Sequence, residues 1–433
     1  MIGVLMLVAL IAAICIGFPM AFTLLAVVVL FGTWGLGARV FDLMVFQTVT
    51  LLKEEVLAAV PLFIFMGYVL EQSGLMERLF LAFRLIFAPL RGSLYLAIIL
   101  TATIFAMATG IVGAAVTVLG IMAGNTLIKS RYDLKLSAGV ITAGGSLGIL
   151  IPPSVMLVVM GPVIGVSVAK LYAAAFGPGL LLAALYLTYA MVRCHLRPEL
   201  GPPLPPAERA TVVVALREFL LGMVPLGVLI FATLGSILAG LATPTEASAM
   251  GAAGSLLLTM SYGQLTWTRV KDATFKTLQT SSMILFLVLT SNFFGSVFAR
   301  LGTSSLVTNT LLGLALPPFV MLLVLNVIIF LLGWPFEWPT IVLVFLPILL
   351  PIVKAMNYDL VWFSLLVAVN LQTTFLSPPV AMAAYYLKAV VPQWELTEII
   401  KGMLPFLVLQ VIGLLIVMLF PPLTTWLPNR LFP

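Results

Sequence analysis

Two uncharged stretches of this chain, each long enough to cross a bilayer, are interrupted by a Pro-Pro pair among small hydroxyl residues. The pair Pro152-Pro153 lies within 136–169, and the pair Pro378-Pro379 lies within 360–390. Proline lacks a backbone N–H and clashes with the preceding helical turn, so both helices are expected to unwind there. Unwound backbone at membrane depth is tolerated only where protein buries it or a polar cavity solvates it. Paired breaks of this kind are typical of the binding site of a secondary transporter.

Composition places most of the chain in lipid. Hydrophobic residues make up 62% of the 433 residues and charged residues 8%, more apolar surface than a soluble domain of this length can bury. The charge-free runs reach or exceed the roughly 20 residues that cross a bilayer core. These runs are 1–38, 92–128, 136–169, 219–245 and 402–429. They lack the alternation of barrel strands, so we expect an all-α polytopic membrane protein.

The ends and charges of the chain support the same class. The apolar N-terminus has no basic region and no cleavage site, so we interpret it as a retained first helix rather than a signal peptide. The net charge of +6 comes from residues between apolar spans, where basic residues orient loops. We therefore expect a lipid bilayer, and no nucleic acid, around this protein.

Four loops with several basic residues constrain the path of the chain. If all four are cytoplasmic, as the positive-inside rule predicts, then 92–128 begins and ends on the same side of the membrane. A re-entrant helical hairpin with its turn near Gly110 satisfies that condition, because glycine permits a tight reversal. The Pro-rich, charged segment 193–218 is then a cytoplasmic linker. The four basic loops are 78–91, 129–135, 193–217 and 269–276.

The two halves of the chain have the same order of elements and opposite orientations. Pro152 and Pro378 stand 226 residues apart (378 − 152) at equivalent places. We therefore expect an inverted repeat, as in alternating-access carriers. The first repeat covers 1–192, with a hairpin at about 92–128 and a broken helix at about 136–169. The second half covers 219–433, with an extra span, a hairpin at about 317–353 and a broken helix at about 360–390.

The breaks predict sites for a cation and a carboxylate. A broken helix has free carbonyl groups on one half and free N–H groups on the other. Carbonyl and hydroxyl oxygens suit Na⁺, and half-helix N-termini suit a carboxylate. The alternative is that the small residues only permit close helix packing. The candidate Na⁺ ligands are Thr109, Gly110, Gly144, Gly145, Ser146, Thr340, Thr374 and Ser377. The candidate substrate-binding residues are Ser154, Asn370, Gln372 and Thr373.

Two acidic residues of the apolar regions have separate interpretations. Glu337 stands alone in the otherwise uncharged stretch 301–353 and is a functional candidate, as a cation ligand, a proton acceptor or one partner of an ion pair. A purely structural role for it remains open. Glu246 follows Thr245 at the start of a helix, where we expect Thr245 to cap and Glu246 to complement the helix dipole.

At these motifs the chain resembles the large membrane subunit of the TRAP (tripartite ATP-independent periplasmic) transporters. The matching runs are spread through nearly the whole chain in family order. They are 61–67, 148–154, 243–247, 346–351 and 377–380. The family's first hairpin usually has a Ser-Gly-Ser turn and its second break Thr-Pro-Pro. Thr109 and Ser377 stand in those places here and keep a hydroxyl group.

The resemblance implies Na⁺-driven uptake of an organic acid by an elevator motion in the bacterial inner membrane. A periplasmic substrate-binding protein would deliver the acid, and a small four-helix membrane subunit would brace the scaffold. One alternative is a standalone ion-coupled carrier or antiporter of the same superfamily, without a binding protein. A membrane enzyme would need convergent Asp, Glu, His or Cys residues, which the uncharged spans do not supply, so we predict that the protein is not an enzyme.

Overall fold

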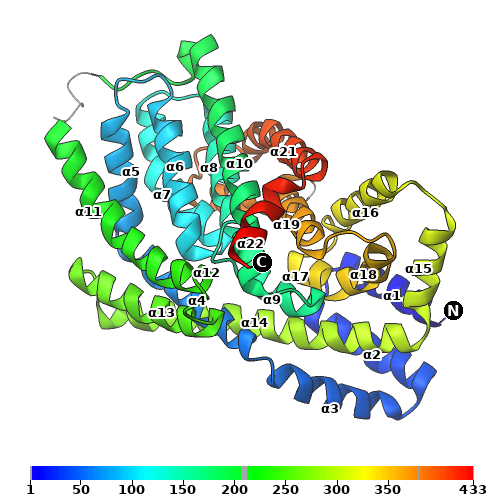
Figure 1. Ribbon diagram of the computed structural model, residues 1–433. Helices are drawn as coiled ribbons and strands as arrows, with labels where there is room; N and C mark the ends of the chain where they lie inside the picture. The colour runs from blue at the N-terminus through cyan, green and yellow to red at the C-terminus, as the bar shows by residue number, and fades with distance from the viewer. Residues whose placement is uncertain (1, 206–211, 379, 433) are drawn as a thin grey trace.

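The computed structural model describes residues 2–205, 212–378 and 380–432, which form helices and turns without any strand (Figure 1). The prediction of an all-α protein is therefore confirmed. Within these residues six helices are long and apolar enough to cross a membrane, or seven if the bent pair Glu55–Glu71 and Leu75–Ile86 counts as one span. The six are Val112–Lys129, Val168–Leu196, Val213–Leu238, Trp267–Arg300, Trp338–Ala355 and Leu396–Leu419.

The first helices of the chain, residues 2–71, form a layer beside the central bundle (Figure 1). The uncharged run 1–38 is not a single helix, because Gly17 at φ +101° and Pro19 interrupt it. Helix α14 (Trp267–Arg300) packs along α2, α3 and α4, so this layer contains elements from both halves of the chain (Figure 1). From the first half it contains α1 (Ile2–Ile16), α2 (Met20–Leu36), α3 (Arg39–Leu52), η1 (Glu55–Ala58) and α4 (Ala59–Glu71). The next helix, α5 (Leu75–Ile86), bends away from α4 by 57° and belongs to the bundle (Figure 1).

The next segment forms a helix pair and an interrupted helix. Helices α6 and α7 pack together and are joined by Gly110, at φ +63°, and the extended Ile111. After α8 the chain passes through a short 3-10 turn and non-helical residues before α9. The elements are α6 (Ser93–Thr109), α7 (Val112–Lys129), α8 (Leu134–Ser146), η2 (Leu147–Ile149), α9 (Val155–Ile164), α10 (Val168–Leu196) and η3 (Pro198–Leu200).

A connecting group of helices follows. The turn before α13 is a capping box, in which the Thr243 hydroxyl accepts the Glu246 N–H at 3.2 Å and Glu246 accepts the Thr243 N–H at 2.8 Å. The predicted cap, Thr245, instead donates its hydroxyl to the Glu55 carbonyl at 3.0 Å. The elements are α11 (Val212–Ile230), a π-helical turn η5 (Phe231–Gly235), α12 (Ser236–Leu238), α13 (Pro244–Ser261), α14 (Trp267–Arg300) and α15 (Thr303–Gly313).

The last part of the chain repeats the order of elements seen in 93–164, a helix pair followed by an interrupted helix. The turn 333–337 joins α16 to the second member of the pair, which consists of α17, the π-helical turn η6 and α18. Helix α19 ends just before Ser377, and α20 starts after Ala381. The elements are α16 (Pro318–Leu332), α17 (Trp338–Thr340), η6 (Ile341–Phe345), α18 (Leu346–Ala355), α19 (Leu360–Leu376), α20 (Met382–Val390), α21 (Leu396–Leu419) and α22 (Pro422–Leu431).

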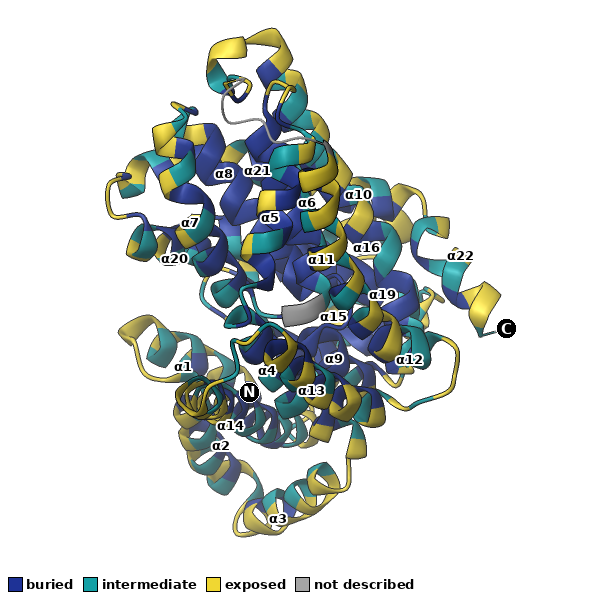
Figure 2. Ribbon diagram, turned by 90° about the vertical axis from the view of Figure 1, so that its left-hand side faces the viewer, coloured by how far each residue is buried: buried dark blue, intermediate teal, exposed yellow. Residues whose placement is uncertain are grey.

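The helix that follows each break packs against the other half of the chain. Helix α9 packs against α17, η6 and α18, whereas α20 packs against α7 and α8. Gly120 and Gly124 of α7 permit the second contact, since a Cβ on either would lie 2.7 Å from a methyl of Val390 or Val391. Figure 2 shows that α8, α9 and α19 are largely buried. The first break, 147–155, is buried throughout, whereas in the second Ser377 and Ala381 are buried and Pro378 is exposed.

Candidate functional site

The turn between α6 and α7 lies directly on the first break. A Cβ added at Gly110 would lie 3.1 Å from the Pro153 carbonyl oxygen and 3.8 Å from Ser154 Cα. The left-handed backbone at Gly110 favours glycine as well, because an L side chain is strained there. We call this contact the first junction.

Close packing explains the glycine pair that precedes the first break. A Cβ at Gly145 would lie 2.9 Å from the Val116 N atom of α7, and one at Gly144 would lie 3.1 Å from Ala102 Cβ of α6. Both arms of the helix pair thus approach α8 where it has no side chains. For these two glycines the structure gives direct support to the packing alternative.

The serines at the first break are used in local hydrogen bonds. Ser146 donates to the Ala143 carbonyl at 2.8 Å. Ser154 donates to the Ile149 carbonyl and caps α9 by accepting the Leu157 N–H at 3.5 Å. The hydroxyl of Ser154 therefore closes the break and starts the next half-helix.

The turn 333–337 contacts the second break in the same manner. A Cβ at Gly333 would overlap the side chain of Thr374, whose Cβ would be 3.3 Å away. The Thr374 hydroxyl donates to the Leu371 carbonyl at 2.8 Å, so its oxygen keeps free lone pairs. Nearby Thr340 and Ser377 are buried, and their hydroxyl oxygens have no hydrogen-bond partner among the described residues. We call this contact the second junction.

The predicted substrate-binding residues of α19 are fully buried. Asn370 donates its amide N–H to the Asn326 carbonyl at 2.7 Å and so ties α19 to α16. Thr373 donates to the Asn370 carbonyl at 2.6 Å. Neither amide atom of Gln372 has a partner within the described part of the chain.

A polar cluster that sequence reasoning missed lies beside Ser146. Gln410 of α21 donates to the Ser146 hydroxyl at 3.3 Å, which links the first break to the last long helix. The buried Tyr186 hydroxyl belongs to the same cluster, where it interacts with Gln410 and Ser146. The sequence does contain a signal for this cluster: Gln410 is a single glutamine in an apolar span, and a polar side chain there needs a buried partner.

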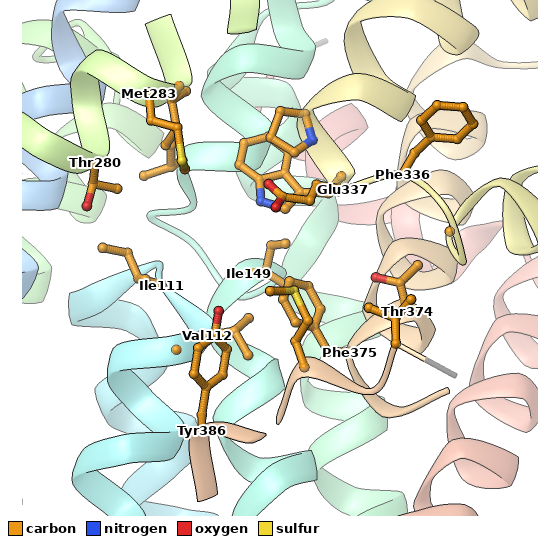
Figure 3. A pocket seen from close by; sticks show the side chains of 18 of the residues that line it. Ile111, Val112, Ile149, Thr280, Met283, Phe336, Glu337, Thr374, Phe375 and Tyr386 are labelled. Atoms are coloured by element: carbon orange, nitrogen blue, oxygen red, sulfur yellow. The ribbon is translucent and has the colours of Figure 1, made fainter. Parts of the chain in front are cut away.

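Residues of both turns and of both breaks line one cavity of about 470 Å³ (Figure 3). Its lining includes the turn residues 110–113 and 333–339, Ile149 and Val155 beside the first break, and 374–375 beside the second. Among the predicted site residues, Gly110 and Thr374 line the cavity. Ser154, Asn370, Gln372 and Thr373 lie outside its lining, as do Gly144, Gly145, Ser146, Thr340 and Ser377. The side chain of Thr109 and all of Pro379 lie outside the described residues.

Glu337 is the charged member of this lining. Its carboxylate projects into the cavity from the turn before α17, opposite Val112 and Tyr386 (Figure 3). No basic side chain forms an ion pair with it in the parts of the chain that the structure describes. The ion-pair interpretation is therefore not the one seen here.

The wall formed by α14 had no signal in the sequence. Thr280 and Met283 reach the cavity from the middle of this 34-residue helix (Figure 3). The Thr280 hydroxyl is 2.9 Å from the Tyr68 hydroxyl of α4. Nothing in the local pattern marks one turn of so long a helix, because only its packing decides which turn faces the cavity.

Comparison with protein families finds one match over almost the whole chain. Residues 5–423 match the family described as "Tripartite ATP-independent periplasmic transporter, DctM component". The chain is 30% identical to the sialic acid TRAP transporter large permease protein SiaM of Vibrio cholerae, over 96% of this chain and 95% of that protein. It is 27% identical to the C4-dicarboxylate TRAP transporter large permease protein DctM of Pseudomonas aeruginosa, over 88% and 87% of the two chains.

A longer relative and a solved structure complete the comparison. The chain is 27% identical to the sialic acid TRAP transporter permease protein SiaT of Haemophilus influenzae over 87% of its own length, and spans 60% of that protein. The fold is similar to the Alcanivorax borkumensis YdaH transporter, with a TM-score of 0.63, 17% identity and 90% of each chain covered. At that identity the likeness describes the fold alone.

Proposed function

Because the chain belongs to the DctM component family of the tripartite ATP-independent periplasmic transporters, we propose that it couples Na⁺ entry to the uptake of an organic acid. The members named above are transporter permeases and not enzymes. The observation that supports the proposal most strongly is the cavity that both turns and both breaks share. A site assembled from four separate segments opens or closes when any of them moves, which is what a coupled carrier requires.

Na⁺ would bind at the two junctions. At the first junction the ligands would be backbone carbonyl oxygens such as that of Pro153, close to the turn at Gly110. At the second, the buried hydroxyl oxygens of Thr340 and Ser377 have unused hydrogen-bonding capacity, and Thr374 has free lone pairs. Neutral oxygen ligands suit a hard monovalent cation. A buried hydroxyl without a partner is otherwise unfavourable, so a bound cation gives these side chains a role.

Binding of Na⁺ would hold each turn against its break and complete the site for the acid. Both helix pairs would then be re-entrant hairpins, and the inverted repeats would carry the closed site across the bilayer as an elevator. The packing of α9 and α20 against the opposite halves supports this idea, because a movement at one junction would displace helices that contact the other.

The family also suggests the setting of the transporter. We place the chain in the bacterial inner membrane, with a small four-helix membrane subunit and a periplasmic substrate-binding protein as partners. The exposed apolar side chains of α2 and α3, among them Phe22, Trp34 and Phe46, provide a surface for lipid or for the small subunit.

Uptake into proteoliposomes that contain this chain and both partner proteins tests the proposal. We expect accumulation of the acid driven by an inward Na⁺ gradient, and its loss when choline replaces Na⁺. Undiminished uptake in choline would reject the coupling. Full uptake without the binding protein would instead support the alternative of a standalone carrier.

A further inference from the structure

The cavity between the two junctions has an unusual charge distribution for a site that takes an acid. Glu337 is the one charged residue in its described lining, and no Lys, Arg or His contributes to that lining. An anion therefore finds no side-chain counter-charge here. A bound acid therefore has to place its carboxylate away from Glu337 and form hydrogen bonds with groups other than basic side chains.

Helix N-termini provide those means on the side of the cavity formed by the first turn and the breaks. Three of the lining residues are the first residues of their helices: Val112 of α7, Val155 of α9 and Met382 of α20. A helix start has up to four N–H groups without an intrahelical partner and a partial positive charge of about half an elementary charge. One such N–H is already bonded in α9, from Leu157 to Ser154, and one in α20, from Ala384 to the Ala381 carbonyl, which leaves the first N–H groups of each helix for a ligand. Three such ends around one space are enough for a single carboxylate without any basic residue.

The rest of the lining is aromatic and apolar. Five aromatic residues belong to this lining: Trp334, Phe336, Trp338, Phe375 and Tyr386. The ring of Phe336 points away from the cavity and packs against Phe345, with centroids 4.8 Å apart (Figure 3). Three of them come from the turn 333–339, which also carries Glu337. The half of the cavity around Glu337 therefore suits an apolar or aromatic body and disfavours a second negative charge.

We propose that this cavity selects organic acids with one carboxylate and an apolar or aromatic body, and discriminates against dicarboxylates. The inference rests on the proposed function and adds the substrate class to it. A second carboxylate would lie near Glu337. Two like charges about 8 Å apart at an effective dielectric constant of about 20 weaken binding about thirtyfold.

A pair of ligands that differ in one charge tests this proposal. Calorimetric titrations of the purified chain in nanodiscs, in NaCl, would compare 4-methylbenzoate with terephthalate, in which a second carboxylate replaces the methyl group. We expect 4-methylbenzoate to bind about thirtyfold more tightly. In the variant Glu337→Gln we expect this ratio to fall to within a few-fold, because the repelling charge is gone.

Several outcomes would overturn the substrate class. These are equal or tighter binding of terephthalate by the wild-type chain, an unchanged ratio in Glu337→Gln, or no binding of either acid at millimolar concentration. The same titrations in choline chloride separate the two proposals. Preferential binding of 4-methylbenzoate that is independent of Na⁺ contradicts the coupling and keeps the class, whereas Na⁺-dependent binding that favours terephthalate contradicts the class and keeps the coupling.

Discussion

Replacement of Gly110 by alanine tests whether contact between the first turn and the first break supports Na⁺ binding. The left-handed backbone at Gly110 costs an L-residue about 1–2 kcal/mol. The added Cβ would also stand 3.1 Å from the Pro153 carbonyl oxygen, which must give way by a few tenths of an ångström. Mild overpacking of this kind adds about 1 kcal/mol.

These two costs have different consequences. The backbone cost is present whether or not Na⁺ is bound, so it lowers the free energy of unfolding and not the affinity for Na⁺. The steric cost opposes closure of the turn on the break, and about 1 kcal/mol corresponds to about a fivefold weaker apparent Na⁺ affinity. We therefore expect the half-saturating Na⁺ concentration for uptake to rise about fivefold.

Gly302 provides a matched control. It lies between α14 and α15 with φ +76°, close to the +63° of Gly110, and a Cβ there would meet nothing within 4 Å. Gly302→Ala should lower stability by the same backbone cost and leave the Na⁺ dependence unchanged. Thermal unfolding in nanodiscs and Na⁺ titrations of uptake with both partner proteins would measure the two effects. The reasoning is refuted if Gly110→Ala and Gly302→Ala show the same Na⁺ dependence.

Three further predictions concern single side chains. Thr340→Val removes a buried hydroxyl that has no partner among the described residues. We expect the half-saturating Na⁺ concentration for uptake to rise at least tenfold. A variant that is more stable and keeps the normal Na⁺ dependence would contradict a role of Thr340 as a Na⁺ ligand. Asn370→Leu breaks the 2.7 Å bond to Asn326 and should lower the free energy of unfolding by about 1–3 kcal/mol. Substrate affinity, measured by calorimetry, should stay within a few-fold. A large loss of affinity at normal stability would instead favour direct substrate contact. Thr243→Ala removes the capping box with Glu246 and should cost about 1 kcal/mol in thermal unfolding without changing transport per folded protein, an expectation that unchanged thermal stability would contradict.

The local features of this chain follow from the chemistry of single residues. The helical run of α8 and η2 ends at Ile149, three residues before Pro152, and α19 ends at Leu376, two residues before Pro378. A proline there removes an N–H and blocks the preceding turn, whereas Pro178 is accommodated inside α10. The first helix pair turns at Gly110, because few other residues adopt a left-handed backbone at little cost. Such effects act within a few residues, so the sequence alone determined the two breaks and the first reversal, together with the lipid environment and the family. It did not determine the cap of α13, which is Thr243 rather than Thr245.

Long-range packing decided what those elements form together. Only the structure shows α9 against the second helix pair, α20 against the first, and a wall of the cavity supplied by Thr280 from α14. It also places Asn370 against Asn326 and outside the cavity lining, where a polar residue near a break suggested a substrate contact. Those outcomes depend on how side chains 44 or more residues apart in the sequence fit each other, and no local periodicity records that fit.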